Sequence, residues 1–318
     1  MLWIRSASCH PNRKSGYWVN IQKPLQRTNG KSILITNNKL TLNMDINQLI
    51  NQCAQLIREA RRVVFLTSAG MSADSNIPTF RDKEGYWSNF PPFKEKGLEA
   101  QDLASPWAFR NELPHAWAFY EWRRRNAAEN SPHAGYTIIN KWIDERFDDA
   151  FIHTTNTDGY HLRSGCPNDK VKEVHGSMWR LQCLNVCSYA YWQEDAVPLC
   201  DLDHDTMKAS NYPKCPRCKG IARPHILMFG DGEYTGHPEQ EKNFHSFARE
   251  PVDLVILVGS SGAVPTNDYL ALEFMRHRAP VININLDPSA NSIVGAEYFL
   301  PLKGKEAFEQ LDEALKTL

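Results

Sequence analysis

Four cysteines form two close pairs in the middle of the chain. Cys183 and Cys187 are followed by Cys215 and Cys218. The sulfurs of two such pairs suit a tetrahedral zinc site. Because all four ligands would be thiolates of the protein, no coordination position would stay open, and we expect one structural Zn²⁺. A redox-active cysteine pair, and a site in which Cys200 replaces one ligand, are the alternatives.

The stretch 63–81, VVFLTSAGMSADSNIPTFR, combines an apolar strand with a loop of small residues. Small residues let backbone amides approach a phosphate closely. Phe80 and Arg81 place an aromatic ring and a permanent cation just beyond the turn. Taken alone, the pattern also fits an ordinary strand–turn–helix, because Gly70 is the only glycine of a G-x-G-x-x-G fingerprint that is present.

Two further segments carry polar side chains after apolar stretches. Residues 154–161 read TTNTDGYH, and residues 174–177 read VHGS. An Asn-x-Asp-Gly sequence by itself favours a type I′ turn. A histidine can transfer protons at neutral pH, although an isolated one is more often structural. We expect His161 to support a site at most, and His153 to have no functional role.

Together these segments resemble, in the same order, those of the sirtuins, the NAD-dependent protein deacylases. The resemblance covers about residues 45–318. Ser68 and Asn76 stand where the family has glycines, and Thr155 and Tyr160 replace a glutamine and a leucine. The matching positions of the first loop are Ala69, Gly70, Ser72, Ser75, Ile77, Pro78, Phe80 and Arg81.

The resemblance implies a role for each segment. Asn156 and Asp158 match the pair that holds the nicotinamide carboxamide, and His175 matches the general base. The strand-like segment 222–231 resembles the one that pairs with the substrate peptide, through Ile226, Phe229 and Gly230. The residues implied to bind NAD are Ser68, Ala69, Gly70, Ser72, Phe80, Arg81, Thr155, Asn156, Asp158, Gly259, Ser260, Ser261 and Asn285.

One helical segment bears on the kind of acyl group. Tyr120 and Arg123 lie three positions apart, which places them on one face of a helix. Sirtuins that prefer acidic acyl groups such as succinyl-lysine carry Tyr-x-x-Arg at this point. A guanidinium and a hydroxyl can hold a terminal carboxylate. The alternative is a solvated basic face, because Arg123 begins a run of three arginines.

The function implied is an NAD-dependent protein-lysine deacylase acting on an acyl-lysine protein or peptide. The acyl group would pass to ADP-ribose, with release of nicotinamide. Protein mono-ADP-ribosyl transfer is an alternative, because some macrodomain-linked microbial sirtuins resemble the segments SAGMSADS, EG-x-W and RP-x-ILMFGD. Several of those proteins lack the catalytic histidine, which this chain keeps as His175. An NAD hydrolase or NAD-binding sensor of the same fold is a third possibility.

Composition and periodicity indicate a globular α/β protein. The chain has 36 Lys and Arg against 37 Asp and Glu, so we expect no direct nucleic-acid contact. No apolar run reaches the ~18–20 residues that span a membrane. Predicted strands alternate with helices, which is typical of a Rossmann-like, doubly wound parallel sheet. Strands are expected at 63–66, 149–155, 253–258 and 281–285, and helices at 44–62, 102–128, 132–147 and 305–318. The aromatic stretch 85–93 is expected to form an irregular flap or an aromatic cluster packed under a loop.

We divide the chain into three parts. Residues 45–178 and 223–318 are expected to form the NAD-binding domain, with a helical insertion at about 85–147, and residues 179–222 the zinc module. Residues 1–44 contain seven Lys or Arg and no acid. They read as a poorly ordered basic arm, as sequence upstream of a start at Met44, or as an organelle-targeting peptide. The expected location is cytoplasmic, or mitochondrial in the last case. The oligomeric state does not follow from the sequence.

Overall fold

Strand β1 (Arg62–Thr67) is buried at every position after the first, as expected for a parallel strand covered on both faces. It pairs in parallel with β2 (Asp149–Thr154) and β9 (Leu254–Val258). Three more parallel strands complete a six-stranded sheet of order β11-β10-β9-β1-β2-β3, namely β3 (Val171–Glu173), β10 (Val281–Ile284) and β11 (Tyr298–Leu300). The computed structural model describes residues 45–79, 86, 88–290, 294 and 298–318.

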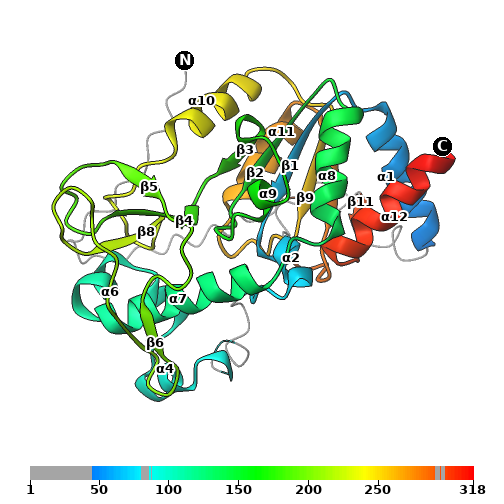
Figure 1. Ribbon diagram of the computed structural model, residues 1–318. Coiled ribbons are helices and arrows are strands. Elements are labelled where there is room, and N and C mark those ends of the chain that lie inside the picture. The colour runs from blue at the N-terminus through cyan, green and yellow to red at the C-terminus, as the bar shows by residue number, and fades with distance from the viewer. Residues whose placement is uncertain (1–44, 80–85, 87, 291–293, 295–297) are drawn as a thin grey trace, which may run out of the picture. The chain divides into compact units, whose positions relative to one another are not determined.

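Successive side chains of β1 enter two separate apolar clusters, because residues of a strand alternate between its faces. Phe65 packs into one cluster and Leu66 into the other. Figure 1 shows the helices arranged about the sheet, and the prediction of a doubly wound α/β fold is confirmed. The helices of the Phe65 face are α1 (Ile46–Glu59), α8 (Ala134–Glu145) and α12 (Gly304–Thr317), and those of the Leu66 face are α10 (Pro238–Phe247) and α11 (Thr266–Arg276).

The single helix expected at 102–128 is wrong. The structure has α5 (Ala100–Leu103), α6 (Pro106–Asn111) and α7 (Leu113–Glu129) in this region. Proline has no N–H and is tolerated only in the first turn of a helix, so Pro106 and Pro114 each mark a new start.

Aromatic packing replaces most of the irregular flap expected at 85–93. Tyr86, Phe90 and Phe93 are buried, and their ring centroids lie 5.1–6.5 Å apart. The short helix α4 (Pro91–Lys96) begins within this stretch. The described residues therefore favour the alternative, an aromatic cluster.

A smaller antiparallel sheet carries the cysteine cluster. It has the order β5-β4-β8, and the hairpin β6 (Asp201–Asp203) and β7 (Lys208–Ser210) follows β5 in the chain. The sheet strands are β4 (Gly176–Cys183), β5 (Tyr191–Gln193) and β8 (Ala222–Ile226). Helix α7 braces this region, because the buried Arg124 donates to the carbonyl oxygens of Glu194 (2.9 Å) and Ala196 (2.8 Å).

Residues 45–318 form one compact unit. The division into an NAD-binding domain and a module at residues 179–222 stays a prediction, and the segment 1–44 lies outside the described residues. Of the helices that the structure describes, none combines the length and the apolarity needed to cross a bilayer.

Candidate active site and metal centre

The first predicted NAD loop, Ser68–Ser72, follows β1 and contains the short helix α2 (Ala69–Ser72). It meets the loop that follows the neighbouring strand β9. The amide of Gly70 donates to the carbonyl oxygen of Gly259 at 3.0 Å. A Cβ on Gly70 would lie 2.6 Å from the Cα of Gly259, so any larger side chain would force the loops apart. Tertiary structure thus joins two predicted NAD-binding segments at the carboxyl ends of β1 and β9.

Three buried side chains converge on the hydroxyl of Ser72. The amide of Asn156 donates to Ser72 Oγ at 2.8 Å, and Ser72 Oγ donates to Asp158 Oδ2 at 2.7 Å. The hydroxyl of Tyr136 lies 2.9 Å from the same Oγ. Burial raises the pKa of Asp158, and its hydrogen bonds and nearby arginines oppose that shift in part. A buried carboxylate beside a carboxamide offers the acceptor and the donor that a nicotinamide carboxamide needs.

The Asn-x-Asp-Gly turn is not a hairpin, so the type I′ interpretation is wrong. Strand β2 is followed by the short helix α9 (Tyr160–Arg163), and Gly159 precedes it with φ +72°. The side chain of Asp158 accepts from the amide of Tyr160 at 2.9 Å. This hydrogen bond fixes the direction of the carboxylate at the start of α9, whose N-cap is Gly159.

His175 lies in the connection between β3 and β4, next to the Thr155 stretch. Its ring is half-buried, and burial lowers its pKa, opposed by an interaction with the backbone of Thr155. The next residue, Gly176, has φ +77°, and a Cβ there would lie 2.2 Å from the carbonyl oxygen of His225. The chain can make this turn only with glycine. Because burial lowers the pKa of His175, its imidazole is neutral at pH 7 and able to accept a proton.

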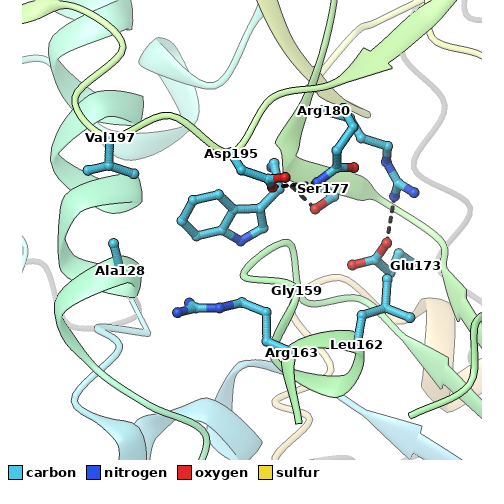
Figure 2. Close-up of a pocket in the computed structure, with 11 residues that line it drawn as sticks. Ala128, Gly159, Leu162, Arg163, Glu173, Ser177, Arg180, Asp195 and Val197 are labelled. Carbon is cyan, nitrogen blue, oxygen red and sulfur yellow. Dashed lines mark hydrogen bonds and ion pairs between the residues drawn. The ribbon is translucent and has the colours of Figure 1, made fainter. Parts of the chain in front are cut away.

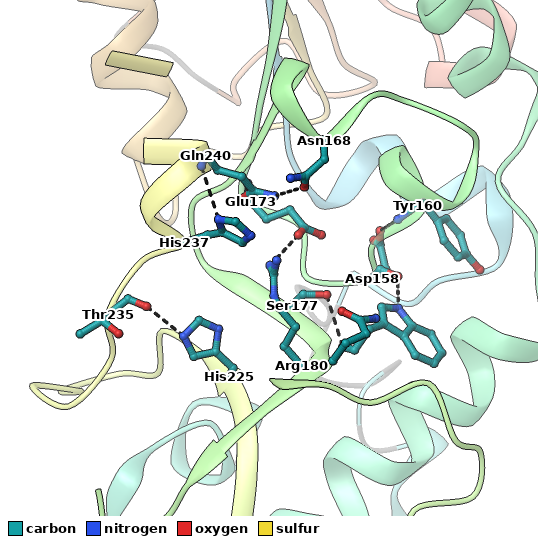
Figure 3. A network of polar contacts seen from close by, with 12 residues as sticks. Asp158, Tyr160, Asn168, Glu173, Ser177, Arg180, His225, Thr235, His237 and Gln240 are labelled. Carbon is teal, nitrogen blue, oxygen red and sulfur yellow. Dashed lines mark hydrogen bonds and ion pairs between the residues drawn. The ribbon is translucent and has the colours of Figure 1, made fainter. Parts of the chain in front are cut away.

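A buried ion pair spans the connection that carries His175. Arg180 on β4 donates to Glu173 on β3 at 2.6 Å, and both side chains are buried (Figure 3). The amide of Glu173 also donates to Gln240 Oε1 at 3.0 Å. Trp179 donates from Nε1 to the carbonyl oxygen of Asp158 at 2.6 Å. The contacts of Arg180 and Trp179 tie β4 of the small sheet to β3 and to the Asp158 turn.

A cavity of about 350 Å³ adjoins this network (Figure 2). Gly159, Trp179 and Arg180 contribute to its lining, and the predicted catalytic residues do not. It shares the Gly159 turn with the candidate site but is not the predicted nicotinamide pocket.

The second half of the predicted NAD site also comes together. Asn285 donates through Nδ2 to the carbonyl oxygen of Ser260, and Ser260 Oγ donates to Asp268 Oδ2 at 2.8 Å. The hydroxyl of Ser261 accepts from the amide of Ala263 at 3.2 Å. These residues follow β9 and β10, which are neighbours in the sheet.

The predicted acyl-recognition pair reaches the same turn from α7. Tyr120 is buried, and the Arg123 guanidinium donates to the hydroxyl of Thr157 at 3.3 Å. The Arg123 Cζ lies 5.6 Å from the centre of the Tyr120 ring. Burial lowers the pKa of Arg123, and Tyr120 and Asp158 oppose that shift. The two side chains therefore lie together, beside the candidate nicotinamide site.

The predicted peptide-binding residues follow one another at the end of β8. Ile226 is buried, whereas Phe229 is 50% exposed and Gly230 is exposed with φ +71°. A fully buried ion pair of 2.8 Å between Arg223 and Asp231 closes the base of this segment.

The four predicted zinc ligands are brought together. Their Sγ atoms lie within 4.8 Å of one another. Cys183 and Cys218 are separated by 3.5 Å, and Cys187 and Cys215 by 3.6 Å. Sulfurs of a tetrahedral zinc site are about 3.8 Å apart, as follows from Zn–S bonds of about 2.3 Å. The cluster thus fits Zn²⁺. Cys200 is not in it, because its thiol contacts Glu121 at 3.7 Å.

Comparison with known proteins shows the family to which a chain with this arrangement belongs. A model of the Sir2 family matches residues 68–266. The chain belongs to the Sir2 family. An NAD-dependent protein deacylase of Aeropyrum pernix is 34% identical over 265 residues, which are 83% of this chain and 96% of that relative. One of Aquifex aeolicus is 33% identical over 227 residues, which are 71% of this chain and 84% of the relative.

The Sir2 fold is also evident in solved structures. A Sir2 homologue in complex with NAD superimposes with a TM-score of 0.68 at 24% identity, over 84% of this chain and 94% of that one. Two of the predicted NAD-binding residues of this Sir2 chain, Phe80 and Arg81, lie outside the described residues.

Sequence reasoning missed several residues that hold the site of this Sir2 chain. Glu173, Arg180 and Trp179 lie close in sequence to His175, but nothing in their spacing reveals that they are buried partners. Asn267 is fully buried at the start of α11, and its amide donates to the hydroxyl of Ser68 in the first predicted NAD loop at 3.1 Å. A polar residue in the first turn of a helix after a small-residue loop was the only signal for it.

Proposed function

We propose that this Sir2 chain is an NAD-dependent protein-lysine deacylase, which transfers the acyl group of a modified lysine to ADP-ribose. The observation that carries the proposal is the convergence of Asn156 and Asp158 on Ser72, next to the stretch that His175 contacts. Two relatives at 33–34% identity bear the name NAD-dependent protein deacylase. NAD, when bound, supplies the glycosidic bond whose cleavage releases nicotinamide and makes acyl transfer possible.

Asn156 and Asp158 would hold the nicotinamide end of the dinucleotide. The Asp158 oxygen accepts and the Asn156 amide donates, in the complementary sense to a carboxamide. Both side chains now bond to Ser72, which a ligand of the same polarity can replace as partner. Because the residues are buried, these hydrogen bonds form away from water, where they orient a ligand strongly.

His175 would act as the general base. Burial lowers its pKa, so the imidazole is neutral at physiological pH and can take a proton from a ribose hydroxyl. The turn at Gly176 and the ion pair between Glu173 and Arg180 flank the histidine, and the carbonyl oxygen of His175 accepts from the Leu227 amide at 3.0 Å.

The acyl preference is supported by α7. Tyr120 and Arg123 lie together beside Thr157, in reach of the same turn as Asp158. A guanidinium there would pair with a terminal carboxylate such as that of succinyl-lysine. We propose that acidic acyl groups are accepted in addition to acetyl.

One assay tests the function. Purified protein is incubated with NAD and an acetyl- or succinyl-lysine peptide, and the products are analysed by mass spectrometry. O-acyl-ADP-ribose that appears only with both substrates is the expected result. Labelled ADP-ribose attached to protein would contradict it in favour of ADP-ribosyl transfer. Nicotinamide release without peptide would contradict it in favour of NAD hydrolysis.

A further inference from the structure

Four polar side chains form a hydrogen-bonded chain that includes Ser68 of the first predicted NAD loop. His153 on β2 contacts Asn267 on α11, and Asn267 contacts Ser68 after β1. Thr155 contacts Ser68 from the end of β2. The elements involved lie far apart in sequence and meet at the carboxyl ends of neighbouring strands, where doubly wound sheets bind their ligands.

The direction of each hydrogen bond follows from the groups that face one another. Asn267 lies 2.9 Å from the carbonyl oxygen of Thr67, which can only accept, so the Asn267 amide nitrogen must face it. The Asn267 oxygen then faces His153 Nδ1 at 2.8 Å, and Nδ1 must donate. Burial lowers the pKa of His153 to about 3, so the ring is neutral and carries its one proton on Nδ1.

The hydroxyl of Ser68 receives two hydrogen bonds. Its Oγ accepts from the amide of Asn267 at 3.1 Å and from the hydroxyl of Thr155 at 3.0 Å. A hydroxyl has two acceptor positions and one donor hydrogen. The Thr155 hydroxyl also lies 3.5 Å from the carbonyl oxygen of Thr67, but its contact with Ser68 Oγ is the shorter one at 3.0 Å, so its single hydrogen is assigned to Ser68. Both acceptor positions of Ser68 Oγ are then filled, and none of the hydrogen bonds of the described residues uses the Ser68 hydrogen, which is left to be donated.

We propose that Asn267 and Thr155 orient the Ser68 hydroxyl so that it donates a hydrogen bond to an oxygen of the bound dinucleotide. Asn267 is a positioning residue, and His153 fixes its orientation, contrary to the expectation that His153 has no role. The inference rests on the proposed function, in which NAD binds at these loops. It also accounts for two departures from the sirtuin pattern, because Ser68 and Thr155 bond to each other.

Calorimetric titration of the full chain with NAD tests the proposal without requiring turnover. Ser68→Ala should raise the NAD dissociation constant about five- to tenfold, the effect of one lost hydrogen bond. Asn267→Ala should raise it by a smaller factor in the same direction. The double variant should bind NAD within about twofold of Ser68→Ala alone, because Asn267 acts through that hydroxyl.

Asn140→Ala is the matched control. Its amide donates to the carbonyl oxygen (2.8 Å) and hydroxyl (3.1 Å) of Ser164, so two comparable hydrogen bonds are lost elsewhere. NAD affinity should not change in this variant. Urea unfolding without NAD separates a loss of stability from a loss of affinity. If Asn267→Ala does not fold, Thr155→Val takes its place, with the same non-additive result expected against Ser68→Ala.

Three results would overturn the proposal: an unchanged dissociation constant in Ser68→Ala, additive effects in the double variant, or an Asn140→Ala variant that is weakened as much. Failure of the wild-type protein to bind NAD would instead refute the proposed function itself. The two failures are therefore distinguishable in one set of titrations.

Discussion

The amide of Gly70 donates to the carbonyl oxygen of Gly259 at 3.0 Å, so the two predicted NAD-binding loops contact each other through their backbones. Gly70→Ala would place a Cβ 2.6 Å from the Gly259 Cα, and neither backbone segment can move away without a cost in free energy. We expect the free energy of unfolding to fall by about 1–3 kcal/mol and NAD affinity to fall with it. Urea unfolding and NAD titration measure the two effects.

Gly232→Ala serves as the control, because a Cβ at Gly232 meets no atom within 4 Å. It should keep both the stability and the NAD affinity of the wild type. Equal behaviour of the two variants would show that the contact between the loops is unimportant.

His175→Ala should lower kcat for deacylation by about 10²–10⁴-fold, the usual contribution of a general base. The pH profile gives a second test. A base must be deprotonated, and burial lowers the pKa of His175, so kcat should rise with pH and reach its half-maximum below about pH 6.5. His277→Ala alters an exposed histidine at the end of α11 and should leave kcat unchanged. Full activity of His175→Ala would exclude the assigned role.

Zinc content should depend on the four-cysteine cluster alone. Cys215→Ala removes one of four clustered sulfurs, so the purified protein should lose its zinc and the region around β4 and β8 should become protease-sensitive. Cys200→Ala removes a buried thiol outside the cluster and should keep one zinc per chain. Elemental analysis measures the zinc content. A wild-type protein that is as stable without zinc as with it would disprove the site.

Arg123→Leu should affect succinyl-lysine substrates more than acetyl-lysine substrates. Loss of a charge-assisted hydrogen bond predicts a fall in kcat/KM of about 10–100-fold for the succinyl peptide. Arg125→Leu is the control variant, because Arg125 lies on the same helix but pairs with Glu121 at 2.8 Å. Equal losses for both peptides in Arg123→Leu would count against carboxylate recognition.

Three buried histidines predict a loss of stability in mild acid. Burial lowers the pKa of His153, His161 and His225 to about 3 each, against about 6.5 in an unfolded chain. Between these values the unfolded state binds more protons, so stability is present above pH 6.5 and declines as the pH falls. The decline should be about 2 kcal/mol per histidine at pH 5.

Urea unfolding at pH 7, 6 and 5, with zinc content followed in parallel, measures this decline. His161→Asn should make the decline smaller, whereas His277→Gln, at an exposed position, should not. A free energy of unfolding that is the same at pH 7 and pH 5 would contradict the prediction.

The sequence by itself determined the family, four strands of the parallel sheet (β1, β2, β9 and β10) and the set of chemical groups. Apolar runs such as 253–258 need only local pattern to be recognised as strands, and the spacing of the cysteine pairs is likewise local. The proline positions were equally visible, yet the predicted helix at 102–128 ran through Pro106 and Pro114. The helical spacing of residues in this stretch favoured a single helix. Each of the two prolines lacks the N–H that a helix interior needs, so the helix is interrupted there.

Only the tertiary structure decided how the chemical groups are held. Asn267 reaches Ser68 across almost two hundred positions, Arg180 closes on Glu173 across the His175 turn, and Gly70 meets Gly259 because β1 and β9 are neighbours. Such contacts depend on which strands pair and at what register, and that outcome reflects the packing of the whole core rather than any local pattern. The residue types of the sequence therefore predicted the chemistry, whereas the fold determined which partners orient the chemical groups.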